Sequence, residues 1–190
     1  MSELRRPLLL RTAVGLLIGL AIWAGLGPIY HRVVIAIASV VFDIAEHPHM
    51  TDLHADGNDV IVNRLDFPKA SPRPSISLGP LTYNIILLTG LFALAPRPHS
   101  DRNVLHFFEA AGVLVIVHVL ALICQIESIY ALNLGAWSSA HYGTFARNAW
   151  SGAAHFYDLF GTPAAAFALW LLFSDSALPT AAPVRRRKGS

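Results

Sequence analysis

The stretch AAGVLVIVHVLALICQI, residues Ala110–Ile126, decides the fold because it carries no charge and is bracketed by Glu109 and Glu127. At about 1.5 Å of rise per residue, a helix of this length reaches roughly 25 Å. Apolar neighbours on both sides extend it to the thickness of a bilayer's hydrocarbon core. The sequence therefore predicts a membrane-spanning helix over residues 107–129.

The composition of the chain excludes most soluble classes. Of its 190 residues 54% are hydrophobic and only 14% are charged, which is too apolar for an ordinary soluble domain. The chain is also too short for a large transporter. Its lone cysteine, Cys124, excludes an intrachain disulfide and the paired-cysteine zinc patterns. We expect an all-α integral membrane protein that contacts lipid and other membrane proteins, with no nucleic-acid partner.

Three further apolar runs predict three further spans, so that residues 1–174 form one four-helix membrane domain. The runs cover residues 12–30, 81–95 and 148–174, the last bent at Pro163. Pro28 is expected to kink or end the first helix. The apolar segment 33–42 that follows is too short for another crossing, and we expect a helical continuation or an interfacial segment.

Residues 43–80 change in character to Asp, His, Asn, Pro and Ser and predict a loop outside the membrane. Its turn signal, residues 55–59, precedes an alternating run and indicates a small β-hairpin with arms near residues 49–55 and 60–67. The prolines after the hairpin favour an extended return to the membrane. The basic tail, residues 175–190, is expected to be disordered or to lie on lipid headgroups.

The placement of Lys and Arg predicts the orientation. The amino end, the turn at residues 97–102 and the tail hold nine of the fourteen basic residues. Cytoplasmic segments carry the excess of basic residues, so both termini are expected in the cytoplasm and the hairpin outside. The predicted location is the bacterial inner membrane.

Small and polar residues at helical spacing predict where this protein meets its partners. In lipid, helices associate through small and hydrogen-bonding residues, because no hydrophobic effect drives them together. The central helix carries one such stripe, and glycines four apart mark another on the first helix. The expected partner-contact residues are Gly15, Gly19, Ala111, His118, Ala121, Gln125, Gly161 and Ala165.

His118 lies near the middle of the central span, where a polar side chain needs a partner. An interhelical hydrogen bond to Thr89 or Asn84 is the simpler interpretation. Ligation of haem or chlorophyll is the alternative, although a transmembrane haem site usually pairs two histidines. No cofactor is predicted, and haem, chlorophyll and metal stay open.

The hairpin segment carries two metal hypotheses. Residues 52–57 resemble the opening of a calcium loop, but the twelfth position is Asn63 and supplies no bidentate carboxylate. Zinc or copper is the second hypothesis, because imidazole and carboxylate are suitable ligands. Its candidate ligands are His47, His49, Asp52 and His54, and solvated turn residues are the competing interpretation.

Cys124 is a candidate nucleophile if a histidine lowers the pKa of its thiol and an arginine stabilises charge. His141, Arg147 and His155 are predicted on the same side of the membrane. An inert cysteine in an apolar helix is the plainer interpretation. His155 and Asp158, three residues apart, also form a candidate proton relay or partner-binding pair.

Four landmarks follow one another along the chain: Ile22-Trp23 in a basic first span, the β-like segment Asp59 to Arg64, Gly79 to Tyr83 leading to Ala93 to Pro96, and the ending Tyr157 to Pro163 with Leu169 to Leu171. In this order they resemble the exosortase H-associated membrane proteins. The resemblance implies an accessory role beside a sorting protease/transpeptidase that processes exported proteins. Exosortases carry cysteine in an Ala-Cys-Ser-Gly context, whereas Cys124 stands in Ile-Cys-Gln-Ile, and this departure argues against carrying a catalytic role over to Cys124.

These observations favour a non-catalytic accessory, assembly or structural subunit of a membrane protein complex. Two alternatives remain at this stage. One is a membrane cysteine protease of the exosortase type that uses Cys124. The other is a pigment- or haem-bearing subunit of an electron-transfer or light-harvesting complex, with His118 as ligand.

Overall fold

The computed structural model describes residues 5–66, 73–95 and 97–174, so the predicted tail and part of the predicted extended return lie outside the described residues. Within that part, three helices are long and apolar enough to cross a membrane: Leu8–Ala45, Asp101–Leu132 and Thr144–Phe173. They correspond to three of the four predicted spans. The remaining predicted span is a shorter apolar helix, Gly79–Phe92, built from α2 (Gly79–Thr82) and α3 (Asn84–Phe92).

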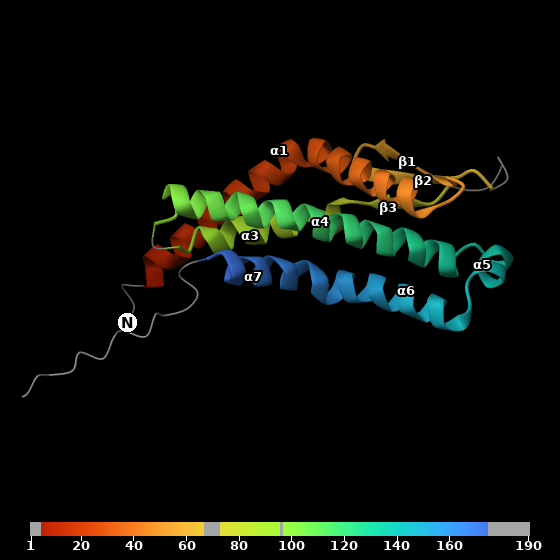
Figure 1. Ribbon diagram of the computed structural model, residues 1–190. Helices are drawn as coiled ribbons and strands as arrows, with labels where there is room; N and C mark the ends of the chain where they lie inside the picture. The colour runs from red at the N-terminus through yellow and green to blue at the C-terminus, as the bar shows by residue number, and fades with distance from the viewer. Residues whose placement is uncertain (1–4, 67–72, 96, 175–190) are drawn as a thin grey trace, which may run out of the picture.

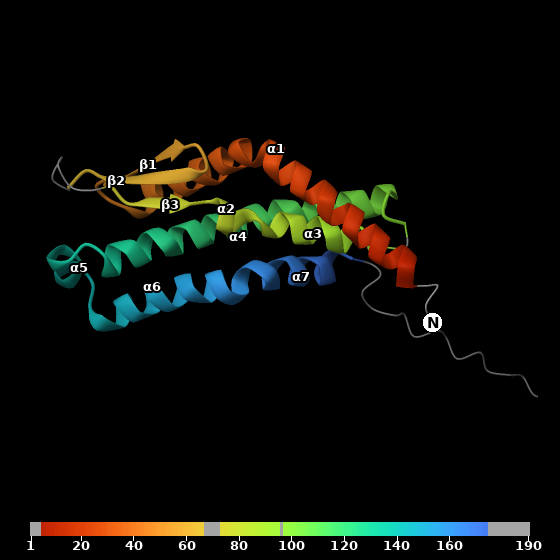
Figure 2. The same ribbon diagram turned by 180° about the vertical axis from the view of Figure 1, so that it is seen from behind.

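The first helix, α1 (Arg5–Ala45), is continuous over 41 residues. Segment 33–42 is thus a helical continuation, one of the two expected forms. Pro28 lies inside α1, where it removes one backbone hydrogen bond and its ring crowds the preceding turn. Figures 1 and 2 show that α1 changes direction about half-way along, in keeping with the expected kink.

The last predicted span is made of three helices joined end to end, and we call this unit the last rod. They are α6 (Thr144–Phe156), a π-helical turn η1 (Tyr157–Gly161) and α7 (Thr162–Phe173). The irregularity precedes Pro163, because this residue has no N–H to donate back along the helix. In the π turn the Thr162 N–H reaches the Tyr157 carbonyl, five residues back. The predicted bend at Pro163 is therefore a widened turn just before it.

The predicted hairpin is present and forms part of a three-stranded antiparallel sheet. Strands β1 (Thr51–Asp56) and β2 (Asp59–Arg64) pair with Asp56 opposite Asp59, which leaves a two-residue turn. Gly57, the first turn residue, has φ of 60°, as a type II′ hairpin requires. The third strand, β3 (Ser75–Ser77), pairs with β2 and is the part that the sequence did not predict.

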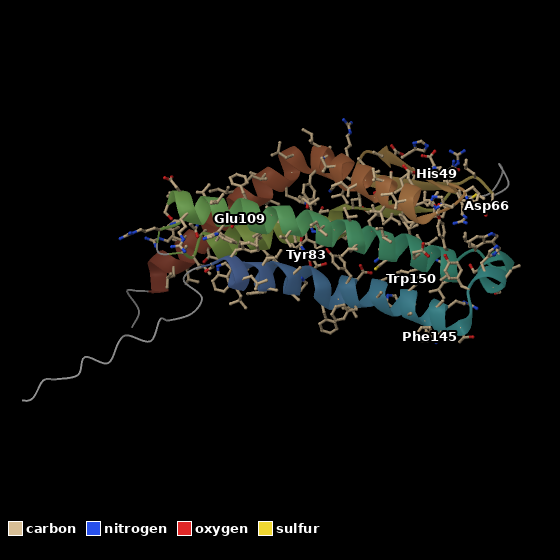
Figure 3. All side chains as sticks on the ribbon, viewed as in Figure 1. His49, Asp66, Tyr83, Glu109, Phe145 and Trp150 are labelled. Atoms are coloured by element: carbon tan, nitrogen blue, oxygen red, sulfur yellow. The ribbon has the colours of Figure 1, made fainter. Side chains whose placement is uncertain are left out.

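The elements place the sheet at one end of an elongated molecule. Helix α1 begins and α7 ends at the opposite end, near the start of α4 (Asp101–Leu132), while α5 (Ala136–His141) closes the sheet end (Figure 1). Figure 2 shows the sheet lying against the second half of α1. His49 and Asp66 mark the sheet end in Figure 3, and Glu109 lies toward the other end.

Two apolar cores lie along this axis. The sheet core joins α1 and α4 to the sheet; its buried members are Val34, Ile35, Ala38, Phe42, Leu53, Val60, Val62, Ile76, Leu78, Leu81, Val119, Ala121, Leu122, Ile126, Tyr130 and Tyr157. The helix core joins α3, α4 and α7 through Leu88, Phe92, Ala110, Leu114, Ala166 and Leu169. The polar side chains buried between these cores form the candidate site.

Candidate functional site

A buried polar layer connects the helices at the level where the two cores meet. Helices α1, α2, α3 and α4 and the π turn all contribute to it, and most of its side chains are inaccessible to solvent. The polar layer consists of Trp23, Tyr30, His31, Thr82, Asn84, His118, Tyr157 and Thr162.

The hydrogen bonds around His118 fix its protonation. The Asn84 amide nitrogen donates to the Thr162 carbonyl at 3.1 Å, so the Asn84 amide oxygen faces His118. That oxygen is 2.6 Å from His118 Nε2, which must therefore carry the proton. His118 Nδ1 is then the acceptor for the Tyr30 hydroxyl at 2.5 Å. His118 is neutral, and one side chain connects α1, α3 and α4.

Thr82 is the second junction of the polar layer. Its hydroxyl donates to the Leu78 carbonyl at 2.9 Å and accepts from Trp23 Nε1 at 3.2 Å. Its remaining acceptor position faces His31 Nε2 at 3.0 Å, which makes that nitrogen the protonated one. His31 Nδ1 is buried and has no hydrogen-bond partner among the described residues.

The π turn joins the same layer from the last rod. Tyr157 donates its hydroxyl to the Leu81 carbonyl at 3.2 Å, and the Thr162 hydroxyl donates to the Tyr157 carbonyl at 3.3 Å. The carbonyl of Thr162, the first residue after the π turn, accepts the hydrogen bond from the Asn84 amide. An irregular backbone at membrane depth is tolerated when its polar groups are satisfied by neighbouring helices, as they are here.

The structure places the predicted partner of His118 in α3. Of the two expected residues, Asn84 makes the bond, whereas Thr89 donates its hydroxyl to Ile85 within its own helix. Neither ring nitrogen of His118 is left to bind haem or chlorophyll without loss of a hydrogen bond. The arrangement is suited to fixing how helices pack, because an unsatisfied polar group in lipid is costly.

The two glycines predicted on α1 contact α3 of the same chain. A Cβ at Gly15 would lie 2.5 Å from the Ala93 Cβ, and one at Gly19 would lie 2.9 Å from the Ile86 Cα. Real Cβ atoms do not approach so closely, so only glycine permits this crossing. The small-residue edge therefore forms a helix contact within the chain.

The other predicted partner-contact residues also lie at contacts within the chain. His118 and Ala121 are buried, and Ala111 and Ala165 pack against the helix core. Gln125 donates from Nε2 to Asp158 Oδ1 at 2.9 Å, which joins α4 to the π turn. A Cβ at Gly161 would lie 2.7 Å from the Tyr157 ring. Asp158 thus pairs with Gln125 rather than with His155.

A second polar cluster, at the sheet end, centres on Arg64. Its guanidinium lies over the rings of Tyr130 and Trp137, at 4.9 and 4.8 Å from the ring centroids. It also bonds Asp66 at 2.9 Å and Glu46 at 3.3 Å. These partners belong to α4, α5, the residue just after α1 and the segment after β2, and we call the group the Arg64 cluster. It anchors the sheet to the helices.

Glu46 completes the Arg64 cluster at the end of α1. Its carboxylate accepts the Thr51 N–H and the Thr51 hydroxyl, both at 2.8 Å, and the Met50 N–H at 3.2 Å. Thr51 in turn hydrogen-bonds the Tyr130 hydroxyl at 2.9 Å. Nearby, Tyr142 donates to Glu127 at 2.7 Å. Burial and this carboxylate raise the pKa of the Tyr142 hydroxyl, which keeps it protonated.

The Arg64→Lys variant is expected to lower the free energy of unfolding by about 1–3 kcal/mol, because an ammonium cannot stack on two rings and bond two carboxylates at once. Denaturant unfolding of the purified protein, followed by tryptophan fluorescence, measures it. Arg73→Lys, an exposed position just before β3, is the matched control and should change nothing. Equal stability of both variants would show that the Arg64 cluster does not anchor the sheet.

Of the four candidate metal ligands, Asp52 and His54 lie together in the structure, whereas His49 contacts a residue outside the candidate set. His49 pairs with Asp43 at 2.7 Å, and His54 pairs with Asp52 at 2.9 Å. Among the described residues, no group of three or more His, Cys, Asp or Glu is arranged to hold a metal ion. His47 precedes a cis peptide bond to Pro48. The observed pairs are exposed contacts between a histidine and a carboxylate around the start of the hairpin.

The candidate catalytic residues are likewise not joined. Cys124 is half-buried on α4. His141 stacks on Trp137 with ring centroids 4.2 Å apart. The distance from His141 Nδ1 to the Trp137 carbonyl oxygen is 2.9 Å. Arg147 Nε is buried without a partner among the described residues, and His155 is exposed. No hydrogen bond within the described chain connects the thiol to these three side chains.

Sequence reasoning missed two parts of the site. The Arg64 cluster has no local motif, since Glu46, Thr51, Arg64 and Tyr130 come from distant positions. The polar layer could have been predicted in part, because each polar group at membrane depth needs a partner. Three such polar residues within apolar runs are Tyr30, His31 and Thr82. Applied beyond His118, that rule would have found most of the polar layer.

Comparison with known proteins adds one finding. A family model described as exosortase H-associated membrane protein matches residues 1–177, which is nearly the whole chain. No curated protein and no solved structure matched.

Proposed function

This chain belongs to the exosortase H-associated membrane protein family, and from that premise we propose that it is a non-catalytic accessory subunit that binds another integral membrane protein of a protein-sorting system. The polar layer and the Arg64 cluster hold its helices and sheet in one arrangement. The observation that carries the proposal is an apolar face of α1 that extends beyond the thickness of a bilayer.

The proposed topology has four spans, with both termini in the cytoplasm of the bacterial cell and the sheet outside the inner membrane. The long helices and the family support a membrane location. The fourth span is α2 with α3, whose 14 residues from Gly79 to Phe92 bury their polar groups against α1 and the last rod. The basic loop at residues 97–102 lies at the end opposite the sheet, which supports the orientation.

Cysteine labelling tests this topology. In a Cys124→Ala background, the Ala55→Cys variant, at an exposed position of β1 next to the hairpin turn, should react with a membrane-impermeant maleimide in intact cells lacking an outer-membrane barrier. Cysteine in place of His99 should react only after the membrane is permeabilised. Labelling of both positions from the same side would overturn the four-span arrangement.

The exposed face of α1 continues past the membrane. From Arg11 to Ile44 the helix rises about 50 Å, whereas the hydrocarbon core is about 30 Å thick. Val40 is 54% exposed and Ile44 is 71% exposed in the last turns of α1. The turns at this end contact the sheet on their other side, and large apolar side chains in water favour coverage by a protein.

The occupant that we propose for this face is a helix of the partner that emerges from the same membrane. Ile22, Ile29, Val33 and Val40 recur at helical spacing on α1 and are exposed. The exposed face therefore runs without a break from the membrane to the sheet end. A second helix beside α1 would cover it over its whole length.

Two charged substitutions on this face test the proposal. Val40→Asp together with Ile44→Asp should reduce partner recovery at least tenfold in gentle detergent extraction followed by mass spectrometry, because each buries a charge at the interface. The protein itself should stay folded, since both positions are exposed. Leu65→Asp, at an exposed position after β2, is the control. Unchanged recovery with the double variant would exclude this face as the binding surface.

A further inference from the structure

An apolar groove lies on the opposite half of the molecule from the sheet. Its volume is about 240 Å³. Helix α1 forms one wall, α4 forms the other, and α3 forms the floor. The lining residues are Gly15, Ile18, Ile22, Thr89, Phe92, Ala93, Pro98, His99, Asn103, Val104, Phe107 and Phe108.

The groove exists because α1 stays close to α3 but away from α4 at this level. The contact of Gly15 and Gly19 with α3 brings those two helices together. Contact of α1 with α4 comes nearer the sheet, where Tyr30 bonds His118. The two walls are apolar and partly exposed, with Ile18 on α1 and Val104 and Phe108 on α4. In a membrane the groove opens to lipid.

The volume of the groove fits a lipid acyl chain and is too small for a helix. A helix with its side chains is about 10–12 Å across and needs a long open face. A cavity of about 150 Å³ accepts one benzene molecule, so by proportion this groove accepts about ten carbons. That matches a large part of one lipid acyl chain within a single leaflet.

The mouth of the groove carries positive charge. Arg11 lies one helical turn before Gly15 and is exposed, on the same face of α1 as Ile18 and Ile22. The exposed Arg97 immediately precedes the lining residues Pro98 and His99.

Two carboxylates lie near this end of α4. Glu109 is paired with His106 at 2.8 Å, and Asp101 occupies the first turn of α4, next to its N-terminus. Arg102, next to Asp101, adds a third arginine, so the described side chains at this end of the molecule include three arginines against two carboxylates, a formal net charge of +1 with histidine neutral. Positive charge above an acyl-sized groove is complementary to an anionic lipid.

We propose that this groove binds one anionic phospholipid, with an acyl chain between α1 and α4 and the phosphate between Arg11 and Arg97. The lipid site lies on the half of α1 away from the sheet and shares Ile22 with the proposed partner-binding face. The lipid would fill the inner part of the gap between α1 and α4 and hold their relative positions.

Native mass spectrometry of the full chain in mild detergent tests the proposal, with dioleoyl phosphatidylglycerol as the anionic probe and dioleoyl phosphatidylcholine as the neutral one. We expect one phosphatidylglycerol to bind at least fivefold more tightly than phosphatidylcholine, since a basic residue near an anionic lipid contributes about that factor. Equal binding of the two lipids would overturn the proposed headgroup contact.

Matched variants locate the site. Val104→Trp and Ile18→Trp fill the groove from opposite walls and should each weaken phosphatidylglycerol binding about tenfold. Arg11→Gln should weaken it about fivefold. The controls are Ile116→Trp, exposed elsewhere on α4, and Arg32→Gln, exposed elsewhere on α1; both should bind normally. Unchanged binding in both groove-filling variants, with thermal melting unchanged, would exclude the groove.

The partner proposal and the lipid proposal can each be contradicted without the other, because their experiments use different variants. Loss of lipid binding in Val104→Trp with normal partner recovery supports the groove as a lipid site. A cross-link from the Val104→Cys variant to a helix of a co-purified protein, with no lipid retained, would show that a protein occupies the groove and would overturn the proposal.

Discussion

The Gly19→Leu variant is expected to lose about 3 kcal/mol or more of stability, among the largest effects of any single substitution in the membrane part of the chain. A Cβ at this position would lie 2.9 Å from the Ile86 Cα and 3.1 Å from the Ile86 carbonyl oxygen. Both are backbone atoms, so no side-chain rotation relieves the overlap. The helices must move apart along their crossing.

The consequences of that separation reach beyond one contact. Helix α3 is short, and its neighbour α2 holds the Thr82 hydroxyl that accepts hydrogen bonds from Trp23 and His31 of α1. Moving α3 away from α1 lengthens these bonds as well. We therefore expect loss of α3 docking to accompany loss of stability, measured as faster proteolysis in the loop at residues 97–102.

Gly25→Leu is the matched control on the same helix. A Cβ at Gly25 would meet no atom within 4 Å, and leucine is a better helix former than glycine. This variant should unfold at the same or slightly higher denaturant concentration than the natural chain. If Gly19→Leu and Gly25→Leu behave alike in detergent unfolding, the close crossing of α1 and α3 does not determine stability.

The glycines show what the sequence could and could not predict. Their four-residue spacing correctly indicated a close helix contact, but spacing alone does not say whether the second helix belongs to the same chain. The structure places it within the chain. The long apolar helices and the hairpin were predictable because hydropathy and turn chemistry are local properties.

Other features were not predictable because they depend on distant positions. Strand β3 has three residues, too few for a recognisable alternation, and it exists only because β2 offers an edge to pair with. The Arg64 cluster joins positions from residue 46 to residue 137. The π turn was anticipated only as a bend, since Pro163 indicates a break in the helix but not its form.

Replacing His118 by Leu is expected to cost about 2–4 kcal/mol of stability, because it leaves two buried polar groups without partners. These groups are the Tyr30 hydroxyl and the Asn84 amide oxygen. Leucine fills a similar volume, so a cavity contributes little. The loss should be measured by equilibrium unfolding in detergent, with retention of helical circular dichroism as the check on folding.

A double-mutant cycle separates the hydrogen bond from the packing. Tyr30→Phe alone should cost about 1 kcal/mol, since it removes the donor to His118 Nδ1. In the His118→Leu background the same change should be neutral or stabilising, because the hydroxyl that it removes no longer has a partner. Tyr83→Phe, partly exposed on α2's C-terminal boundary, should change stability by less than about 0.5 kcal/mol in both backgrounds. Additive effects of Tyr30→Phe and His118→Leu would mean that α1 and α4 are joined by packing alone. The polar layer would then not fix the helix arrangement that presents the α1 face to a partner.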